Sequence, residues 1–436
     1  MTNSKKTVYV ALSVDLIHPG HLNIISHARK LGSVIIGLLT DKAIISYKKP
    51  PIMNYQDRYK IASSLKGVDK VVPQHTLDYE KNLNLLKPDF VLHGDDWKKG
   101  PQVKIRSKVI KILKKYGGKL VEVPHSEGYG TSSISNLLDE LKSTPDLRRK
   151  SLKKLLLSQR SVRFLDIHNG LSGLIIENTK VKIKNKLEEF HGMWASSLTN
   201  STAKGKPDIE AVDLTERLQL LNEVLEVTTK PIIYDGDTGG KSEHFVFTVK
   251  SLERLGASAI IIEDKIGLKK NSLFGTDVFQ KQDNIKSFCK KITEGRKAKK
   301  TEEFMIIARI ESLILNKGID DALTRAKSYI KAGADGIMIH SRKRNPKEIF
   351  DFCKKYNKFK NRKPLVIVPS SFSQVKEQEL INAGANIIIY ANHLLRSVYP
   401  NMIKTAESIL KNKRSLEAEK NLLSIKQILE LIPGTK

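Results

Sequence analysis

The feature that most constrains the fold is a series of eight short apolar segments that recur through the second half of the 436-residue chain. Each segment has the length of a buried strand and leaves room for a helix before the next one begins. Strands and helices that alternate eight times predict a (β/α)8 barrel of the TIM type. The segments are Phe164–Ile167, Gly192–Ala195, Pro231–Tyr234, Ala259–Ile262, Met305–Ala308, Gly336–Ile339, Leu365–Val368 and Ile387–Tyr390.

The first half of the chain also alternates strand and helix patterns, but with fewer strands. Alternation of this kind predicts a Rossmann-like, doubly wound parallel sheet, in which ligands bind beyond the carboxyl ends of the strands. Ser143-Thr144-Pro145-Asp146 is a helix-start signal, so we place two domains at residues 1–142 and 147–436. The predicted strands of the first domain are Val8–Val14, Val34–Leu39, Val71–Val72, Phe90–Leu92 and Leu120–Val123.

Composition limits the function classes. Lys and Arg number 76 against 47 Asp and Glu, a formal net charge of +29, but aromatic residues are only 6% and the lysines are spread along the chain. We therefore expect a solvated basic surface; the alternative, a nucleic-acid-binding protein, predicts binding that weakens steeply with salt. Two cysteines exclude a disulfide scaffold, and no apolar run is long enough to span a membrane. These features predict a cytoplasmic protein that binds neither nucleic acid nor membrane.

The first predicted strand leads into His18-Pro19-Gly20-His21, which opens a helix. Gly20 lets a ligand approach the backbone, and the free N–H groups of a helix N-terminus favour an anion. The two histidines could donate hydrogen bonds to a phosphate as charge builds up during group transfer. The alternative is a pair of surface histidines in a strand–helix turn.

Residues 7 to about 140 resemble the cytidylyltransferase family of nucleotidyltransferases, which transfer CMP from CTP to a phosphate-like acceptor. The resemblance rests on the two histidines together with Lys48-Lys49-Pro50-Pro51, Arg58 and Tyr129-Gly130-Thr131-Ser132. It implies that His18 and His21 stabilise the α-phosphate in the transition state. It also implies that the nucleotide and its phosphates are held by Lys48 or Lys49, Arg58, Thr131 and Ser132.

Polar side chains follow each apolar segment of the second half, where a barrel carries its chemistry. Asp235 and Asp237 are two residues apart, so on an extended chain they point the same way. Glu263 after the next strand could join them around a hard cation, Mg²⁺ or Mn²⁺. Arg309 could bind a phosphoryl or carboxylate group. The strand ends are His168-Asn169, Ser196-Ser197, Asp235-x-Asp237, Glu263-Asp264, Arg309-x-Glu311, His340-Ser341, Ser370-Ser371 and Asn392-His393.

From about residue 147 onward the sequence resembles phosphoenolpyruvate mutase, of the isocitrate lyase superfamily. Residues 263–272 match the mutase pattern Glu-Asp-Lys-x-x-x-Lys-x-Asn-Ser throughout. The resemblance implies that Asp235, Asp237 and Glu263 hold Mg²⁺ directly or through water, and that Asp208 lies close to the migrating phosphoryl group. It also implies a substrate site lined by Trp194, Ser196, Ser197 and Leu198, anion binding by Arg309 and His340, and a gating loop that carries Lys269, Asn271 and Ser272.

Together the resemblances imply a bifunctional enzyme of phosphonate biosynthesis. The barrel would interconvert phosphoenolpyruvate and 3-phosphonopyruvate, and the first domain would transfer CMP to 2-hydroxyethylphosphonate or 2-aminoethylphosphonate. The alternatives are a first domain that binds nucleotide without catalysis, and a phosphonopyruvate hydrolase, which Asn271-Ser272 disfavours. The resemblance also implies a homodimer or homotetramer that exchanges C-terminal barrel helices. Residues 178–187 are a basic insertion, which we expect to lengthen the first barrel helix or its loop.

Overall fold

The computed structural model describes residues 6–47, 51, 53–98, 102–124, 144–183 and 186–432, except for the side chains of Asp96 and Lys186. The chain divides into two compact units, one of Met1–Arg160 with Lys180–Glu189 and one of Ser161–Thr179 with Phe190–Lys436. Over the described ranges, no helix has the length and apolar character needed to cross a membrane.

A parallel sheet forms the centre of the first unit, and its described strands follow the order β3-β2-β1-β4-β5. The central strand β1 alternates between two cores: Val8 and Val10 pack on one face of the sheet, and Tyr9 packs on the other. Both faces are therefore covered, which confirms the predicted doubly wound sheet. The strands are β1 (Thr7–Leu12), β2 (Ser33–Leu39), β3 (Lys70–Gln74), β4 (Phe90–Gly94) and β5 (Lys119–Val123).

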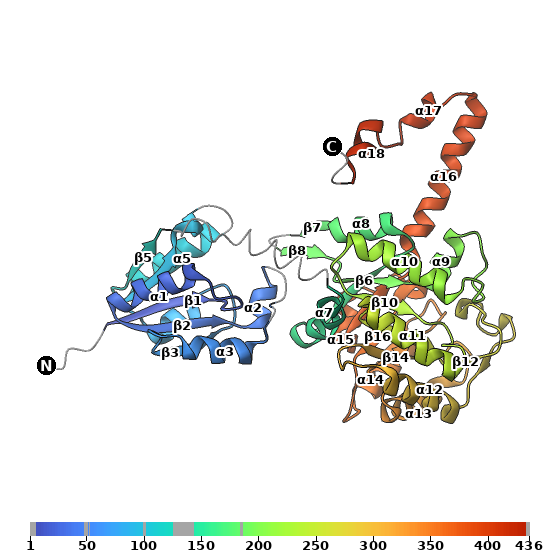
Figure 1. Ribbon diagram of the computed structural model, residues 1–436, viewed down its shortest axis with the longest axis horizontal. Helices are drawn as coiled ribbons and strands as arrows, with labels where there is room; N and C mark the ends of the chain where they lie inside the picture. Colours follow the sequence, from blue (N-terminus) through green and yellow to red (C-terminus); the bar gives the residue numbers. More distant parts are fainter. Residues whose placement is uncertain are drawn as a thin grey trace. The chain divides into compact units, whose positions relative to one another are not determined.

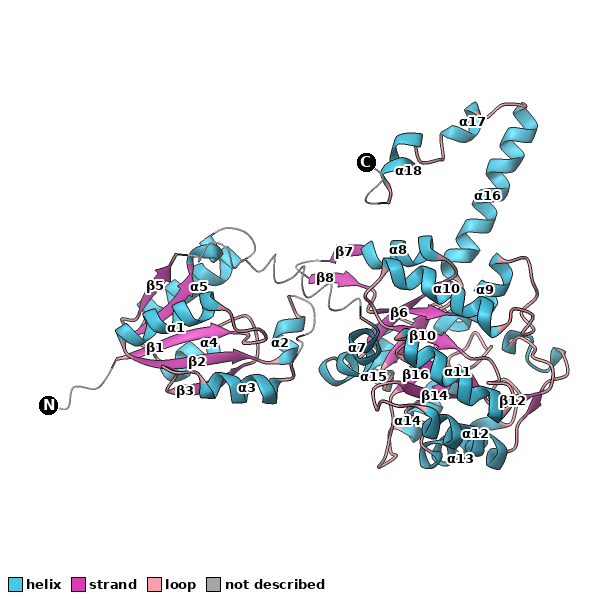
Figure 2. Cartoon of the chain, in the orientation of Figure 1, coloured by secondary structure: helices cyan, strands magenta, loops and turns pink. Residues whose placement is uncertain are grey.

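Helices of the first unit cover this sheet, as Figures 1 and 2 show. They are α1 (Pro19–Leu31), α2 (Asp41–Ile45), α3 (Tyr55–Ser64), α4 (Glu80–Leu86), the 3₁₀ helix η1 (Asp95–Lys98) and α5 (Val103–Lys114). The unit also includes α7 (Pro145–Ser158), which contacts α2.

The basic insertion forms an antiparallel hairpin of β7 (Lys180–Ile183) and β8 (Lys186–Glu189), in which Val181 pairs with Glu188. The insertion therefore lengthens the connection between the first barrel helix, α8 (Gly170–Asn178), and the next barrel strand, as one predicted alternative had it; the other alternative, a longer helix, is wrong, because α8 ends at Asn178. The physical reason is the alternation Lys-Val-Lys-Ile, which has the period of a strand and contains β-branched residues.

The second unit contains a closed barrel, and the described strands around it number eight, all parallel. Its last strand pairs with its first, Ile389 lying opposite Phe164, so the predicted TIM-type barrel is confirmed (Figure 2). The strands are β6 (Val162–Ile167), β9 (Gly192–Ala195), β10 (Ile232–Asp235), β11 (Ala259–Glu263), β14 (Met305–Ile310), β15 (Gly336–Ile339), β16 (Leu365–Ile367) and β17 (Ile387–Tyr390).

Helices surround the barrel, and a longer connection joins β11 to its helix. That connection contains β12 (Lys265–Ile266), the 3₁₀ segment η3 (Ser272–Asp277) and β13 (Lys281–Gln282). We call residues 265–282 the gating segment. The helices are α8, α9 (Ser197–Ala203), α10 (Leu214–Val227), α11 (Ser242–Leu255), α12 (Ile285–Ala298), α13 (Gly318–Ala332), α14 (Lys347–Tyr356), η4 (Pro369–Phe372) and α15 (Glu377–Ala383).

The C-terminal helices α16 (His393–Asn412), α17 (Leu416–Glu419) and α18 (Ile425–Glu430) extend away from the rest of their unit (Figure 1). No side chain of α16 is buried. Apolar side chains on it nevertheless recur at helical spacing, among them Tyr399, Met402 and Leu410, each about two thirds exposed. This arm therefore has apolar surface that the single chain does not cover.

Candidate active site

A cavity lies at the carboxyl ends of the barrel strands. Trp194 from β9 and Asp235 and Glu263 from β10 and β11 line it together with Arg309 from β14 and residues of the gating segment. Every barrel residue to which the family resemblance gave a role lines this cavity except Asp237, whose carboxylate lies against the lining residue Lys269. Of the other strand-end residues, Ser370 and Asn392 also line it. The predicted residues on the cavity wall are Trp194, Ser196, Ser197, Leu198, Asp208, Asp235, Glu263, Lys269, Asn271, Ser272, Arg309 and His340.

Lys269 and Asn271 fasten the gating segment to the barrel. The Lys269 ammonium donates to Ser197 Oγ at 2.5 Å, to Asp208 Oδ1 at 2.6 Å and to Asp237 Oδ1. Asn271 Nδ2 donates to the other Asp208 oxygen at 2.8 Å. Burial lowers the pKa of Lys269, but the carboxylates of Asp237, Asp235 and Asp208 outweigh it and raise that pKa above its usual value. The Lys269 side chain therefore stays charged and holds the gating segment against the barrel over the cavity.

Lys265, which was not among the predicted site residues, organises the gating segment from within. Its buried ammonium donates to Lys270 O at 2.8 Å, Ser272 Oγ at 2.9 Å and Gln280 Oε1 at 2.8 Å. It also lies 3.2 Å from Glu263 Oε1 and 3.8 Å from Glu311 Oε2. The sequence offered one indication of this role, namely the position of Lys265 in the Glu-Asp-Lys stretch. The role itself depends on contacts with Lys270, Ser272 and Gln280, which only the fold brings together.

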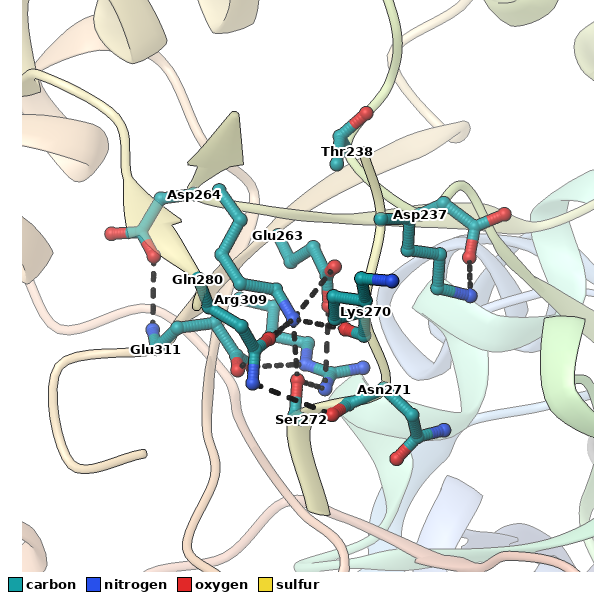
Figure 3. A network of polar contacts seen from close by, with 12 residues as sticks. Asp237, Thr238, Glu263, Asp264, Lys270, Asn271, Ser272, Gln280, Arg309 and Glu311 are labelled. Carbon is teal, nitrogen blue, oxygen red and sulfur yellow. Dashed lines mark hydrogen bonds and ion pairs between the residues drawn. The ribbon is translucent and has the colours of Figure 1, made fainter. Parts of the chain in front are cut away.

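Arg309 is fixed by partners on three sides. Its Nη2 donates to Ser272 Oγ at 2.6 Å and lies 3.3 Å from Glu263 Oε2, and its Nε donates to Glu311 Oε1 at 2.5 Å (Figure 3). His340 Nδ1 lies 3.0 Å from Nη2 and must accept, because a guanidinium only donates. Burial and the neighbouring Arg309 charge lower the pKa of His340, so its imidazole is neutral. The Arg309 guanidinium is therefore held in one position on the cavity wall, and binding of an anion by this pair stays a prediction.

Asp235 and Asp237 differ in what surrounds them. Asp235 Oδ2 accepts from the Ser197 N–H at 3.2 Å and its hydroxyl at 3.1 Å. Asp237 Oδ2 accepts from Arg217 Nη1 at 2.8 Å, and Arg217 Nη2 donates to the Asp235 carbonyl at 2.6 Å. Burial opposes ionisation of Asp237, but the charges of Arg217 and Lys269 outweigh burial and lower its pKa. Sequence reasoning missed Arg217, which comes from the first turn of α10 and stands in no motif.

The cavity has the donor chemistry of a hard cation. Asp235 and Glu263 offer carboxylate oxygens of the kind that Mg²⁺ prefers, and Glu263 Oε1 is buried without a hydrogen-bond donor. Burial raises the pKa of Glu263, so a further positive charge would favour its ionised form. Across the described ranges, no group of three His, Cys, Asp or Glu side chains could hold a metal unaided. The donors thus fit Mg²⁺ completed by water or substrate, and Asp237, which pairs with Lys269 and Arg217, stays a predicted ligand of that ion, directly or through water.

The first unit has its own cavity, at the carboxyl ends of β1 and β4, lined by both predicted histidines. The ring centroids of His18 and His21 are 3.9 Å apart, and His21 Nδ1 accepts from the His18 N–H at 3.4 Å. A Cβ on Gly20 would lie 3.0 Å from the His18 ring, so a glycine permits this approach. Trp97, stacked on His93 at 3.9 Å between centroids, adds an aromatic wall that the sequence analysis did not predict.

The remaining nucleotide-binding predictions fare differently. Lys48, Lys49, Thr131 and Ser132 lie outside the described residues. Arg58 requires a correction, because its side chain is fully buried. It donates to the carbonyls of Met53 at 3.1 Å and Leu39 at 2.8 Å, and to the Asp41 carboxylate at 2.5 Å. These contacts join α3 to the end of β2, so Arg58 braces the turn near the cavity and is not exposed to a nucleotide.

Comparison with known proteins assigns both units. Residues 152–410 match the family model described as phosphoenolpyruvate phosphomutase, and residues 13–147 match the cytidylyltransferase-like model. A phosphoenolpyruvate phosphomutase of Tetrahymena pyriformis is 34% identical over 298 residues, which cover 68% of this chain and 95% of that protein. An ethanolamine-phosphate cytidylyltransferase of Dictyostelium discoideum is 38% identical over 137 residues, 30% of this chain and 37% of that protein.

A solved structure resembles the barrel unit. The crystal structure of a phosphonopyruvate hydrolase in complex with oxalate and Mg²⁺ superposes with a TM-score of 0.58 and 30% sequence identity. The similarity covers 65% of this chain and 94% of that one.

Proposed function

The chain belongs to the phosphoenolpyruvate phosphomutase family, and from that membership we propose that its barrel interconverts phosphoenolpyruvate and 3-phosphonopyruvate. The observation that carries the proposal is the closed gating segment, because Lys269, Asn271 and Ser272 all reach the cavity from it. Moving a phosphoryl group from oxygen to carbon, and not to water, requires such a dry and positively charged enclosure. A hydrolase is the second candidate, since a phosphonopyruvate hydrolase shares this barrel.

The residues of the cavity have separable tasks in this reaction. Arg309 presents a planar fork to an anionic oxygen of the substrate, and the neutral His340 keeps that fork oriented. Lys269 adds a positive charge from the lid side, and the Ser197 N–H and hydroxyl fix Asp235. Mg²⁺, which a related crystal structure contains, would be held by Asp235 and Glu263 and would stabilise the enolate form of pyruvate.

The mutase proposal is tested by ³¹P NMR of the full chain with Mg²⁺ and phosphonopyruvate. We expect phosphoenolpyruvate without free phosphate; phosphate with pyruvate would establish the hydrolase instead. Asp208→Ala removes the anchor of Lys269 and Asn271 and should abolish conversion. Asp277→Ala is the matched control, because its carboxylate lies on the same segment, is largely exposed and pairs with Arg342.

For the first unit we propose transfer of CMP from CTP to a small phosphonate, such as 2-hydroxyethylphosphonate or 2-aminoethylphosphonate. The supporting observation is the pair of imidazoles at the start of α1, held together beside the cavity. Both can donate to a phosphate as negative charge develops on it. The alternative is a unit that binds nucleotide without catalysing transfer.

Pyrophosphate release with CTP and each candidate phosphonate separates these alternatives. His18→Ala should lose CMP transfer while CTP binding persists, and the mutase reaction should not change. His75→Ala, an exposed histidine of the same unit, is the control. Failure of the unmodified chain to release pyrophosphate with every acceptor would leave nucleotide binding as the function of this unit.

We further propose that the chain forms a homodimer or homotetramer through α16, and that it works in the cytoplasm. The support is the uncovered apolar side chains of α16, which a second copy could bury. Light scattering after size exclusion measures the mass directly. A monomer at micromolar concentration would contradict the assembly, and Met402→Glu should weaken it if the proposal is right.

A further inference from the structure

A basic cleft lies on the barrel unit, outside both sites described above. Five lysines line it: Lys327 and Lys331 from α13, and Lys355, Lys358 and Lys360 from the end of α14 and the chain after it. All five side chains are exposed, and the described residues that line the cleft include no carboxylate. Charge is therefore concentrated in one concavity and is not compensated within it.

The cleft faces away from the catalytic cavity. The chain after α14 leads into the amino end of β16, which begins at Leu365, whereas the catalytic residues follow the carboxyl ends of the strands. Figure 1 shows α13 and α14 together on the outer layer of the barrel. A ligand in this cleft would leave the substrate cavity free.

Few of these charges are neutralised by neighbours. Lys355 pairs with Asp320 at 2.9 Å, and Asp320 is itself 91% exposed. The ammonium of Lys327 lies 5.2 Å from the centre of the Phe359 ring. Within the described part of the chain, Lys331, Lys358 and Lys360 have no ion-pair partner. Three unpaired ammonium groups, with two more beside them, form a strong local positive potential.

We propose that this cleft binds an oligophosphate, as free pyrophosphate or as the triphosphate of a nucleotide. Closely spaced ammonium groups match an anion that carries several charges within a few ångströms. The geometry disfavours single-stranded nucleic acid, which needs an open aromatic face along a groove. Phe359 offers no such face, because Lys327 covers its ring and the Tyr356 ring packs 5.1 Å from it between centroids.

The test is acetylation footprinting of the full chain, read residue by residue by mass spectrometry. Pyrophosphate, CTP and a single-stranded oligonucleotide are titrated separately at about 150 mM ionic strength, where weak screening contacts are suppressed. We expect pyrophosphate and CTP to protect the five lysines at lower concentration than they protect Lys286, Lys290 and Lys300, which are exposed lysines near or on α12. Protection by CTP alone would identify the nucleotide as the source of the phosphates.

Two triple variants make the test specific. The first variant combines Lys331→Gln, Lys358→Gln and Lys360→Gln. It should raise the ligand concentration that gives half-maximal protection of Lys327 and Lys355 about tenfold, since each surface ion pair contributes a few-fold at most. The second variant replaces Lys286, Lys290 and Lys300 by glutamine and should leave that half-maximal concentration within about twofold of the value for the unmodified chain. Equal protection of both lysine sets, equal effects of both variants, or protection by the oligonucleotide alone would overturn the proposal. Whether or not the cleft binds an oligophosphate, the mutase and transferase proposals are unaffected, because none of these lysines lines their cavities.

Discussion

Replacing Lys265 by Met should open the gating segment without removing any group that lines the cavity. In the closed segment the Lys265 ammonium satisfies Lys270 O, Ser272 Oγ and Gln280 Oε1 and neutralises two carboxylates. Methionine has a similar length but no donor and no charge. The variant would therefore leave Glu263 and Glu311 buried with one cation fewer between them.

The magnitude follows from the burial of this cluster. Breaking a buried ion pair by removing one partner costs about 3–5 kcal/mol, because the remaining charge stays desolvated. At about 1.4 kcal/mol per factor of ten, the closed state becomes less populated by about two to four orders of magnitude. Since the reaction needs the closed state, kcat/KM should fall by a similar factor. Opening also admits water, so a larger share of the remaining turnover should end as free phosphate.

The assay is ³¹P NMR of phosphonopyruvate conversion, combined with limited proteolysis of the gating segment. Lys281→Met is the matched control, because Lys281 is an exposed lysine of the same segment. A thermal melt of both variants checks that the barrel stays folded. If Lys265→Met kept kcat/KM within about fivefold of the original and the segment stayed resistant to protease, the assigned role of Lys265 would be refuted.

Three further predictions follow from individual contacts. Arg309→Lys should lower mutase kcat/KM about a hundredfold in the phosphonopyruvate assay, because an ammonium cannot keep the bonds to Ser272 and Glu311 while binding substrate. Burial raises the pKa of Asp166 to about 8 from 3.8, so folding disfavours its ionised form and stability should fall as pH rises across that interval. Asp166→Asn should flatten this dependence of Tm on pH, and parallel curves would contradict the assignment. Gly20→Ala should displace the His18 ring and lower CMP transfer about tenfold with mutase activity unchanged, as pyrophosphate release and ³¹P NMR can check.

The sequence was sufficient for the barrel because its strands are buried on both faces. Ile260, Ile261 and Ile262 are all buried, so β11 appears in the sequence as a continuous apolar run of strand length. The polar residue at the end of that run, Glu263, then marks the catalytic edge. Both signals are local, and they predicted the strand-end residues of the cavity, whereas Trp194, Asp208 and the residues of the gating segment were implied only by the family resemblance.

Contacts between distant residues could not be predicted in this way. Arg217 and Arg58 each lie within an amphipathic helix, where an arginine usually faces solvent. Only the fold places Arg217 under Asp237, 20 residues away along the chain, and Arg58 against the end of β2. The role of Lys265 was hidden for the same reason, because its acceptors come from three separate positions of a segment whose regular elements are short.

Charge in the catalytic cavity links closure of the gating segment to binding of an anionic substrate. Lys269 belongs to the segment that closes, yet its ammonium neutralises Asp208 and Asp237 of the barrel. Asp235 accepts hydrogen bonds from Ser197 instead, whereas Glu263 lies 3.2 Å from the Lys265 ammonium and 3.3 Å from Arg309 Nη2. In the proposed reaction, Mg²⁺ held by Asp235 and Glu263 would offset the negative charge that these carboxylates present to an anionic substrate. Closure and charge balance are therefore linked, because the closing segment brings the Lys269 ammonium to Asp208 and Asp237. The groups involved are the carboxylates Asp208, Asp235, Asp237, Glu263 and Glu311 and the cations Arg217, Lys265, Lys269 and Arg309.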